Sequence, residues 1–210
     1  MIAASPAESD LLPTIAWHLT GEGPTFAIEG GVYDAGSALE WARDIGLFSA
    51  MEELGSFEGP SALSRGIVFV PALSGLAAPY WDRQAAPLFI GMDHATDRRD
   101  LVRAVLEGIA MLTVGLIEAA AKVGELGPSI SIDGGLSQSA YFAQFLASAS
   151  NRSITVAPMH ELTALGLAEL AGVDVRGART AAKTFKPDGT VGASDHARFA
   201  KAIERARAWR

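Results

Sequence analysis

The spacing of hydrophobic residues changes from a strand pattern to a helix pattern within the first quarter of the chain. Residues 14–19 and 25–29 are short runs rich in β-forming residues, and the turn-forming sequence Thr20-Gly21-Glu22-Gly23-Pro24 separates them. This arrangement predicts a β-hairpin. From Ser37 onward, apolar residues recur at helical spacing, which predicts an amphipathic helix to about Leu54.

The remainder of the chain alternates between predicted strands and helices. Short apolar runs predict strands at 67–70, 88–90, 129–133 and 154–156. Helical patterns follow a cap at Thr96 or Asp97, and then cover 137–150, 162–171 and about 194–209. We expect residues 1–10 to be a frayed leader. Early strands followed by alternating strand and helix predict one α/β domain over residues 11–210, with a mixed sheet flanked by helices.

Composition narrows the functional classes. The chain has 210 residues, of which 49% are hydrophobic, and its net charge is −7. An acidic surface repels phosphate backbones, so nucleic acid is not an expected partner. The longest uncharged apolar stretch, 66–81, is broken by Pro71, Gly75 and Pro79, so no membrane span is expected. We therefore expect a cytoplasmic protein. With no cysteine and no histidine pair at metal-ligand spacing, no metal site is expected from these residues.

One strand-to-helix junction has the features of an anion site. The sequence Ile132-Asp133-Gly134-Gly135 ends a predicted strand and opens a helix. Glycine allows the backbone to approach a ligand, and a helix N-terminus offers unpaired N–H groups and a positive dipole end. Phosphate or a nucleotide would suit it; a plain tight turn capped by Asp133 remains the alternative. The junction is neither a dinucleotide fingerprint nor a Walker A loop.

A second glycine lies at a similar place. Gly36 opens a helix and Glu40 follows one turn later; Gly135 and Ser139 repeat that spacing. Residues four apart share a helix face, so the two pairs could line two sides of one ligand. The alternative for each pair is a helix-start glycine with a solvated polar residue.

Taken together, these segments resemble one family. Residues 29–44 read EGGVYDAGSALEWARD and are similar to the E-G-x-V-x-x-A-G-x-x-x-Q-W-x-R-D stretch of glycerol kinases, within the FGGY carbohydrate kinase family. Residues 69–82 read FVPALSGLAAPYWD and resemble their F-V-P-A-F-S-G-L-x-A-P-Y-W-D segment. The similarity continues through residues 103–110, Asp133-Gly134-Gly135 and 161–172, and it spans roughly Leu11 to Gly172 in order.

The resemblance implies a ribonuclease-H-like domain, the C-terminal half of a two-domain, actin-like ATPase. In that family ATP with Mg²⁺ lies between the halves. The family's nucleotide contacts fall on Gly36, Glu40, Gly135 and Ser139, with Gly134 in the same D-G-G sequence. The family's N-terminal half, which supplies the polyol site and the catalytic aspartate, has no counterpart here. The resemblance therefore implies an inactive isolated chain that needs an N-terminal kinase half, or a second copy of itself, as partner.

Two residues depart from the family pattern. Glu40 replaces a glutamine and Ser139 replaces an asparagine. A carboxylate near a nucleotide repels its phosphates, which weakens the expected affinity for ATP. These departures motivate a second hypothesis, in which the chain is a noncatalytic remnant or an interaction module of the same fold.

Overall fold

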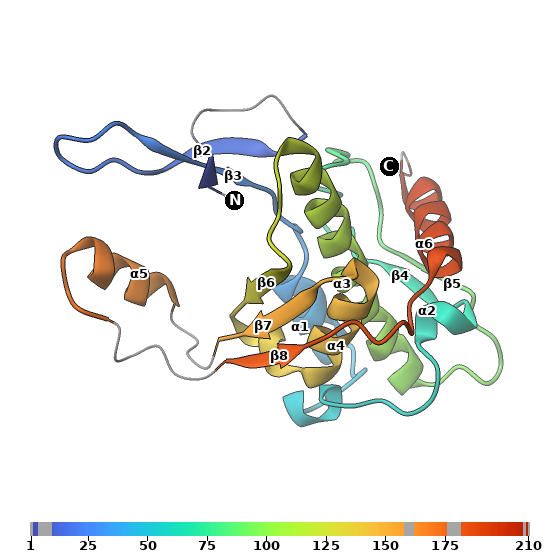
Figure 1. The fold of residues 1–210 in the computed structure, drawn as a ribbon. Helices are drawn as coiled ribbons and strands as arrows, with labels where there is room; N and C mark the ends of the chain where they lie inside the picture. The colour runs from blue at the N-terminus through green and yellow to red at the C-terminus, as the bar shows by residue number, and fades with distance from the viewer. Residues whose placement is uncertain (1, 4–9, 158–161, 176–181, 208, 210) are drawn as a thin grey trace.

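The computed structural model describes residues 2–3, 10–157, 162–175, 182–207 and 209. Most of the expected leader, together with His160 and Glu161, lies outside these residues. A long central helix, α3 (Arg98–Val123), runs through the molecule, with sheets and shorter helices packed around it (Figure 1). The hairpin and helix α5 project on one side, and helix α6 lies on the other.

The described strands form three sheets. The first is antiparallel, in the order β1-β3-β2, and consists of β1 (Ile2–Ala3), β2 (Leu12–Trp17) and β3 (Thr25–Glu29). The second pairs β4 (Val68–Val70) with β5 (Leu88–Ile90). The third joins β6 (Ser129–Ile132) in parallel to β7 (Ser153–Val156), which pairs antiparallel with β8 (Lys183–Phe185). The predicted hairpin and the mixed sheet are confirmed, but β1 and β8 were not predicted.

The predicted helices are present with three boundaries moved inward, at the end of α1, the start of α4 and the end of α6, and the short helix α2 was not predicted. Along the chain they are α1 (Gly36–Asp44), the 3₁₀ turn η1 (Met51–Leu54), α2 (Ala62–Arg65), α3, η2 (Gly135–Gln138), α4 (Ala140–Ser150), α5 (Leu162–Leu170) and α6 (Ala193–Ala206). Helix α1 ends ten residues earlier than expected because Gly46 adopts φ +83°, a left-handed conformation that terminates helices. Helix α4 begins only after η2, at an N-cap formed by Ser139.

The core joins α1 to the second sheet. Trp41 of α1 stacks on Phe69 of β4, with ring centroids 5.7 Å apart, and Phe69 contacts Phe89 of β5 at 4.3 Å. Helix α3 approaches β4 closely at Gly108, where an added Cβ would lie 2.2 Å from the Phe69 carbonyl oxygen. These contacts fix α1 relative to α3.

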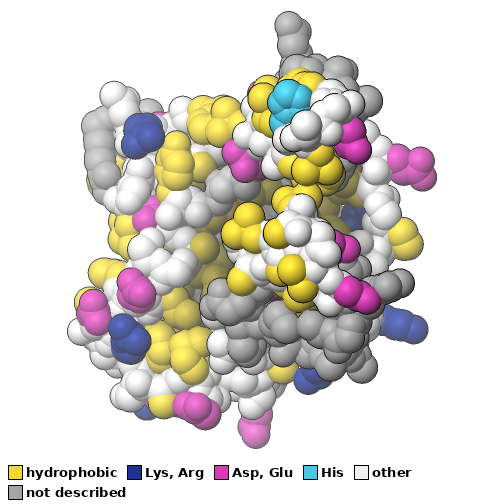
Figure 2. Space-filling view, turned by 90° about the vertical axis from the view of Figure 1, so that its left-hand side faces the viewer, with side chains coloured by type: hydrophobic (Ala, Val, Ile, Leu, Met, Phe, Trp, Pro, Cys, Tyr) yellow, Lys and Arg dark blue, Asp and Glu magenta, His cyan; other side chains and the backbone are white. Residues whose placement is uncertain are grey.

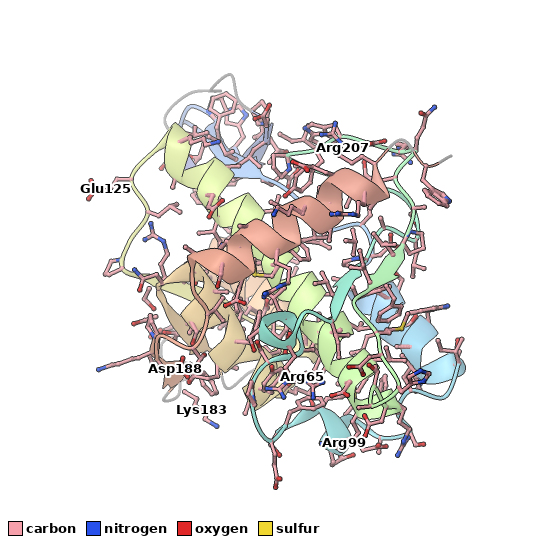
Figure 3. All side chains as sticks on the ribbon, turned by 90° about the vertical axis from the view of Figure 1, so that its right-hand side faces the viewer. Arg65, Arg99, Glu125, Lys183, Asp188 and Arg207 are labelled. Carbon is pink, nitrogen blue, oxygen red and sulfur yellow. The ribbon has the colours of Figure 1, made fainter. Side chains whose placement is uncertain are left out.

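Helix α3 also has the length and hydropathy of a membrane span, although 61% of its most apolar window is buried inside the molecule. A core helix has the same properties, so length and composition alone do not distinguish the two. Arg65 of α2 pairs with Asp100 in the first turn of α3, and Arg207, the residue after α6, donates to Asp82 at 3.2 Å in the loop between β4 and β5 (Figure 3).

Candidate nucleotide site

One cavity lies between α1 and the turn that follows β6. Its volume is about 360 Å³. The residues that line it come from α1, from the segment leading through η1, and from the start of η2: Gly36, Leu39, Glu40, Arg43, Phe48, Met51, Asp133, Gly135 and Leu136. The structure therefore brings three predicted site residues, Gly36, Glu40 and Gly135, to the same cavity.

Helix α1 provides the charged wall. Gly36, Glu40 and Arg43 are spaced by four and then three residues, so they share one face of the helix. The start of α1 is anchored by buried Asp34, whose carboxylate accepts from the Ser37 hydroxyl at 3.0 Å and from the Ser74 backbone N–H at 2.6 Å. The N-terminal end of α1 is thus held beside the cavity, where its dipole favours negative charge.

The opposite wall is the turn after β6. Gly134 adopts φ +83°, a conformation that side-chain-bearing residues rarely adopt, and this directs the chain into η2. Ser137 stabilises the turn by donating its hydroxyl to the Gly134 carbonyl at 2.7 Å. At Gly135 an added Cβ would meet no atom within 4 Å, so this side of the turn is open.

The inner surface of the cavity is apolar. Leu39 and Phe48 are only 7% and 3% exposed, and Met51 and Leu136 complete the surface. The charged groups Glu40, Arg43 and Asp133 surround it. An apolar interior with a few polar groups is typical of small-molecule sites, and it would accept a flat ring with an attached charged group.

Two predicted residues do not line this cavity. Gly134 shapes the turn instead of facing the space. Ser139 is 2% exposed, and its hydroxyl donates to the Leu54 carbonyl at 2.6 Å while accepting from the Phe142 N–H at 3.0 Å. Ser139 is therefore a buried helix cap.

Sequence reasoning missed Arg43, Phe48 and Met51. Arg43 could have been found, because it lies seven residues after Gly36 and thus on the same helical face. Among the described residues no carboxylate pairs with its guanidinium, which leaves that cation available to the cavity. Phe48 and Met51 carry no comparable signal, since they approach the cavity only after the chain turns at Gly46.

A second polar cluster is buried between α2, α3 and α4. Glu107 accepts from the Ala62 and Leu63 N–H groups at 3.0 and 2.6 Å, from Arg103 at 3.1 Å and from the Tyr141 hydroxyl. Burial raises the pKa of Glu107, and these hydrogen bonds and the Arg103 charge oppose that rise. Burial, with the Glu107 charge beside it, also raises the pKa of Tyr141. The cluster caps α2 and ties three helices together.

Comparison with known proteins identifies the family of the chain. The profile of the C-terminal domain of the FGGY family of carbohydrate kinases matches residues 6–175. The chain belongs to this family. It is 40% identical over 167 residues to the glycerol kinase of Thermococcus gammatolerans, a match that covers 79% of the chain and 34% of that relative. The glycerol kinase of Francisella tularensis subsp. novicida is 33% identical over 99% of the chain and 44% of its own length.

Solved FGGY structures show the same fold. The crystal structure of Plasmodium falciparum glycerol kinase with ADP superimposes with a TM-score of 0.77 at 28% identity, covering 93% of this chain and 42% of that one. Gluconate kinase from Lactobacillus acidophilus superimposes with a TM-score of 0.69 at 22% identity, which supports the fold alone. The actin-like ATPase fold expected from the sequence is confirmed. The chain spans less than half the length of these curated relatives, as expected of a C-terminal domain of the family.

Proposed function

We propose that this chain is the nucleotide-binding C-terminal part of an ATP-dependent glycerol kinase. The observation that carries the proposal is the convergence of Gly36, Glu40 and Gly135 on one cavity of about 360 Å³. The similarity to an ADP-bound glycerol kinase supports adenine nucleotide as the ligand. The noncatalytic alternative is less favoured, because the relatives reported above are kinases and the cavity is open to a ligand.

In this proposal the apolar inner surface receives the adenine ring, and the phosphates lie toward positive charge. The start of α1 supplies helix-dipole charge, and Arg43 supplies a full cation. Glu40 and Asp133 carry the oxygen ligands that Mg²⁺ prefers, so the cavity is compatible with an ATP–Mg²⁺ complex. Bound Mg²⁺ neutralises phosphate charge during phosphoryl transfer.

The proposal requires a partner for catalysis. Phosphoryl transfer depends on positioning the acceptor as well as the nucleotide, and the chain corresponds to 34–44% of the length of glycerol kinases. The proposed partner is the N-terminal kinase part or a second copy of this chain. Without it, we expect no ATP-dependent phosphorylation of glycerol, and turnover by the purified chain in a coupled assay would contradict this expectation.

One face of the molecule supports a partner. In the described part of the chain, β6 pairs with a strand on one edge only, and an apolar groove of about 330 Å³ lies beside it. The groove is lined by hairpin residues and by the second half of α3, including Leu11, Ile28, Leu116 and Ile117. Figure 2 shows hydrophobic side chains gathered on this side of the molecule. A free strand edge beside apolar surface suits β-strand addition by the remaining kinase polypeptide.

Nucleotide binding is tested directly by isothermal titration calorimetry with Mg²⁺–ADP. NMR spectra of isotope-labelled protein should show shifts at Gly36, Arg43 and Gly135 on saturation. Shifts confined to residues outside the cavity, or no heat and no shifts, would overturn the proposed site.

A further inference from the structure

The two walls of the candidate nucleotide cavity are far apart in the sequence. One wall includes Met51 of η1, and the other includes Gly135 and Leu136 of η2. The cavity keeps the width that a ligand needs only if η1 is held at a fixed position relative to η2. The hydroxyl of Ser139 makes that connection: it donates at 2.6 Å to the carbonyl of Leu54, the last residue of η1 and 85 residues away.

The same hydroxyl has a second role at the start of α4. It accepts from the Phe142 N–H at 3.0 Å, which is a standard N-cap bond. Ser139 is 2% exposed and the Leu54 side chain is fully buried, so both bonds lie away from solvent. Without the Ser139 hydroxyl, the buried Leu54 carbonyl would have neither a hydrogen-bond donor nor water, which is strongly unfavourable. This contact therefore constrains the position of η1.

The other polar contacts of η1 point elsewhere. Glu53 accepts from the Ser49 and Ala50 N–H groups at 2.8 and 3.1 Å, and it pairs with Arg98 at 3.3 Å. Those bonds hold η1 to its own loop and to the start of α3. Among the described side-chain hydrogen bonds, the Ser139 bond is the one that spans the two cavity walls.

We propose that Ser139 is a positioning residue that latches η1 to η2 and so fixes the width of the cavity. This inference rests on the proposed nucleotide site for its functional consequence. At this position the family resemblance implied a direct nucleotide contact through asparagine. In this chain the serine hydroxyl faces the protein interior, and it affects ligand binding through Met51 and Leu136.

Three substitutions separate the two roles of the Ser139 hydroxyl, which are the bond to the Leu54 carbonyl (the latch) and the N-cap of α4. Ser139→Ala removes both hydrogen bonds. Ser139→Asp, measured at a pH where the new carboxylate is ionised, keeps a cap acceptor for Phe142 N–H but has no proton to donate to Leu54. Ser139→Thr keeps both functions and serves as the conservative rescue. Ser61→Ala is the matched control, because Ser61 caps α2 by accepting from the Ser64 N–H at 3.0 Å and lies outside the nucleotide cavity.

The first measurement is hydrogen exchange of the full chain without ligand. The latch predicts faster exchange of the 51–54 amides in both the Ala and Asp variants, by about fivefold or more, with near wild-type rates in the Thr and Ser61→Ala variants. If Ser139→Asp leaves residues 51–54 protected as in wild type, Ser139 is only a cap and the inference is wrong. Should the Ala variant fail to fold, the Asp and Thr variants still decide the question.

The second measurement is calorimetric titration with Mg²⁺–ADP. We expect the Ala and Asp variants to bind about fivefold more weakly than wild type, and the Thr and Ser61→Ala variants to bind within about twofold of it. Unchanged affinity in the Asp variant, despite faster exchange, would overturn the functional part of the inference. If wild type itself binds no nucleotide, the proposed function fails, while the exchange experiment still tests the latch.

Discussion

Glu40 places a negative charge on the same cavity wall as Arg43, in a space proposed to receive phosphates. We expect Glu40→Gln to tighten binding of metal-free ADP by about fivefold, because removing one exposed like charge near the phosphates is worth about 1 kcal/mol. The gain should shrink at high salt, where such repulsion is screened. Calorimetry in a chelating buffer at two salt concentrations measures both effects.

Glu52→Gln is the control for that substitution, since it removes an η1 carboxylate that does not line the cavity. It should leave the affinity for ADP unchanged. Weaker binding by Glu40→Gln would contradict the repulsion argument and would indicate that the carboxylate accepts a hydrogen bond from the ligand.

The buried cluster around Glu107 makes a different prediction at the residue scale. Glu107→Ala leaves Arg103, which is 5% exposed, without its carboxylate partner, and it removes the acceptor for two N–H groups of α2. We expect a loss of about 3 kcal/mol in the free energy of unfolding, because an uncompensated buried charge is costly. Tyr141→Phe, which removes one hydroxyl, should cost about 1 kcal/mol.

Urea unfolding measures both losses, with exposed Glu125→Gln (Figure 3) as the control. Equal losses for Glu107→Ala and Glu125→Gln would show that the cluster contributes nothing beyond ordinary surface charge.

Local sequence patterns predicted three of the residues that line the candidate cavity and missed the others for a physical reason. Gly36 and Glu40 were predicted because one helical turn returns a residue to the same face, and Gly135 because it follows a strand at the start of a helix. Ser139 obeys the same spacing, yet η2 intervenes and its hydroxyl bonds to Leu54. The spacing of neighbouring residues cannot predict this hydrogen bond, because it joins segments that are 85 residues apart in the sequence.

At the scale of elements, capping gives the sharpest test. Thr96 or Asp97 was expected to start a helix; Asp97 is the cap, and its carboxylate accepts from the Asp100 N–H at 2.9 Å at the start of α3. Asp97→Ala should lower the free energy of unfolding by about 1 kcal/mol, whereas Asp97→Asn, which keeps a cap acceptor, should cost much less. Thermal and urea unfolding compare the three proteins; equal stability of the Ala and Asn variants would contradict a capping role.

The hydrophobic pattern alone did not predict where each helix and strand begins and ends. The apolar spacing of α1 continued to Phe48, but the helix ends before Gly46, and Phe48 packs from the following loop. Strand β8 was missed because it is three residues long and gains its hydrogen bonds from β7, almost 30 residues away. In contrast, the hairpin and α3 were predicted, since their patterns are long and their turns or caps are local.

The loop after β8 is held to α4 by the Asp188 carboxylate and by Gln144, whose amide donates to the Lys186 carbonyl at 2.8 Å. Asp188, labelled in Figure 3, accepts from the Ser148 hydroxyl at 2.7 Å and from the Thr190 hydroxyl at 2.7 Å. Partial burial raises the pKa of Asp188, but these hydrogen bonds outweigh it, and the net pKa lies below the ordinary value of 3.8. The folded state therefore binds this proton less readily than the unfolded chain.

Stability from Asp188 should thus be present above about pH 4 and be lost as the pH falls through the lowered pKa. Because the side chain is exposed, we expect a contribution below about 1 kcal/mol. Urea unfolding at pH 6 and pH 3 should show a smaller pH effect in Asp188→Asn than in wild type. An equal effect in both proteins would assign the acid sensitivity to other groups.

At the scale of the whole molecule, hydrophobic surface gathers on the side that carries the hairpin and α5 (Figures 1 and 2). Ile15 of β2 is 59% exposed, and Leu167 of α5 is 64% exposed. None of the described residues of α5 is buried. An apolar helix that faces water gains little stabilisation from hydrophobic burial. We therefore expect another polypeptide to cover the side with the hairpin and α5 in the functional protein.

The prediction for the isolated chain is concentration-dependent self-association through this side. Ile15→Lys and Leu167→Lys should each reduce association, because a charge placed in an apolar contact is costly to desolvate. Met92→Lys is the control, since Met92 is 53% exposed and follows β5 on the other side of the molecule. Sedimentation velocity over a range of concentrations measures the effect. If all three variants associate like wild type, the hairpin and α5 do not form the contact between copies.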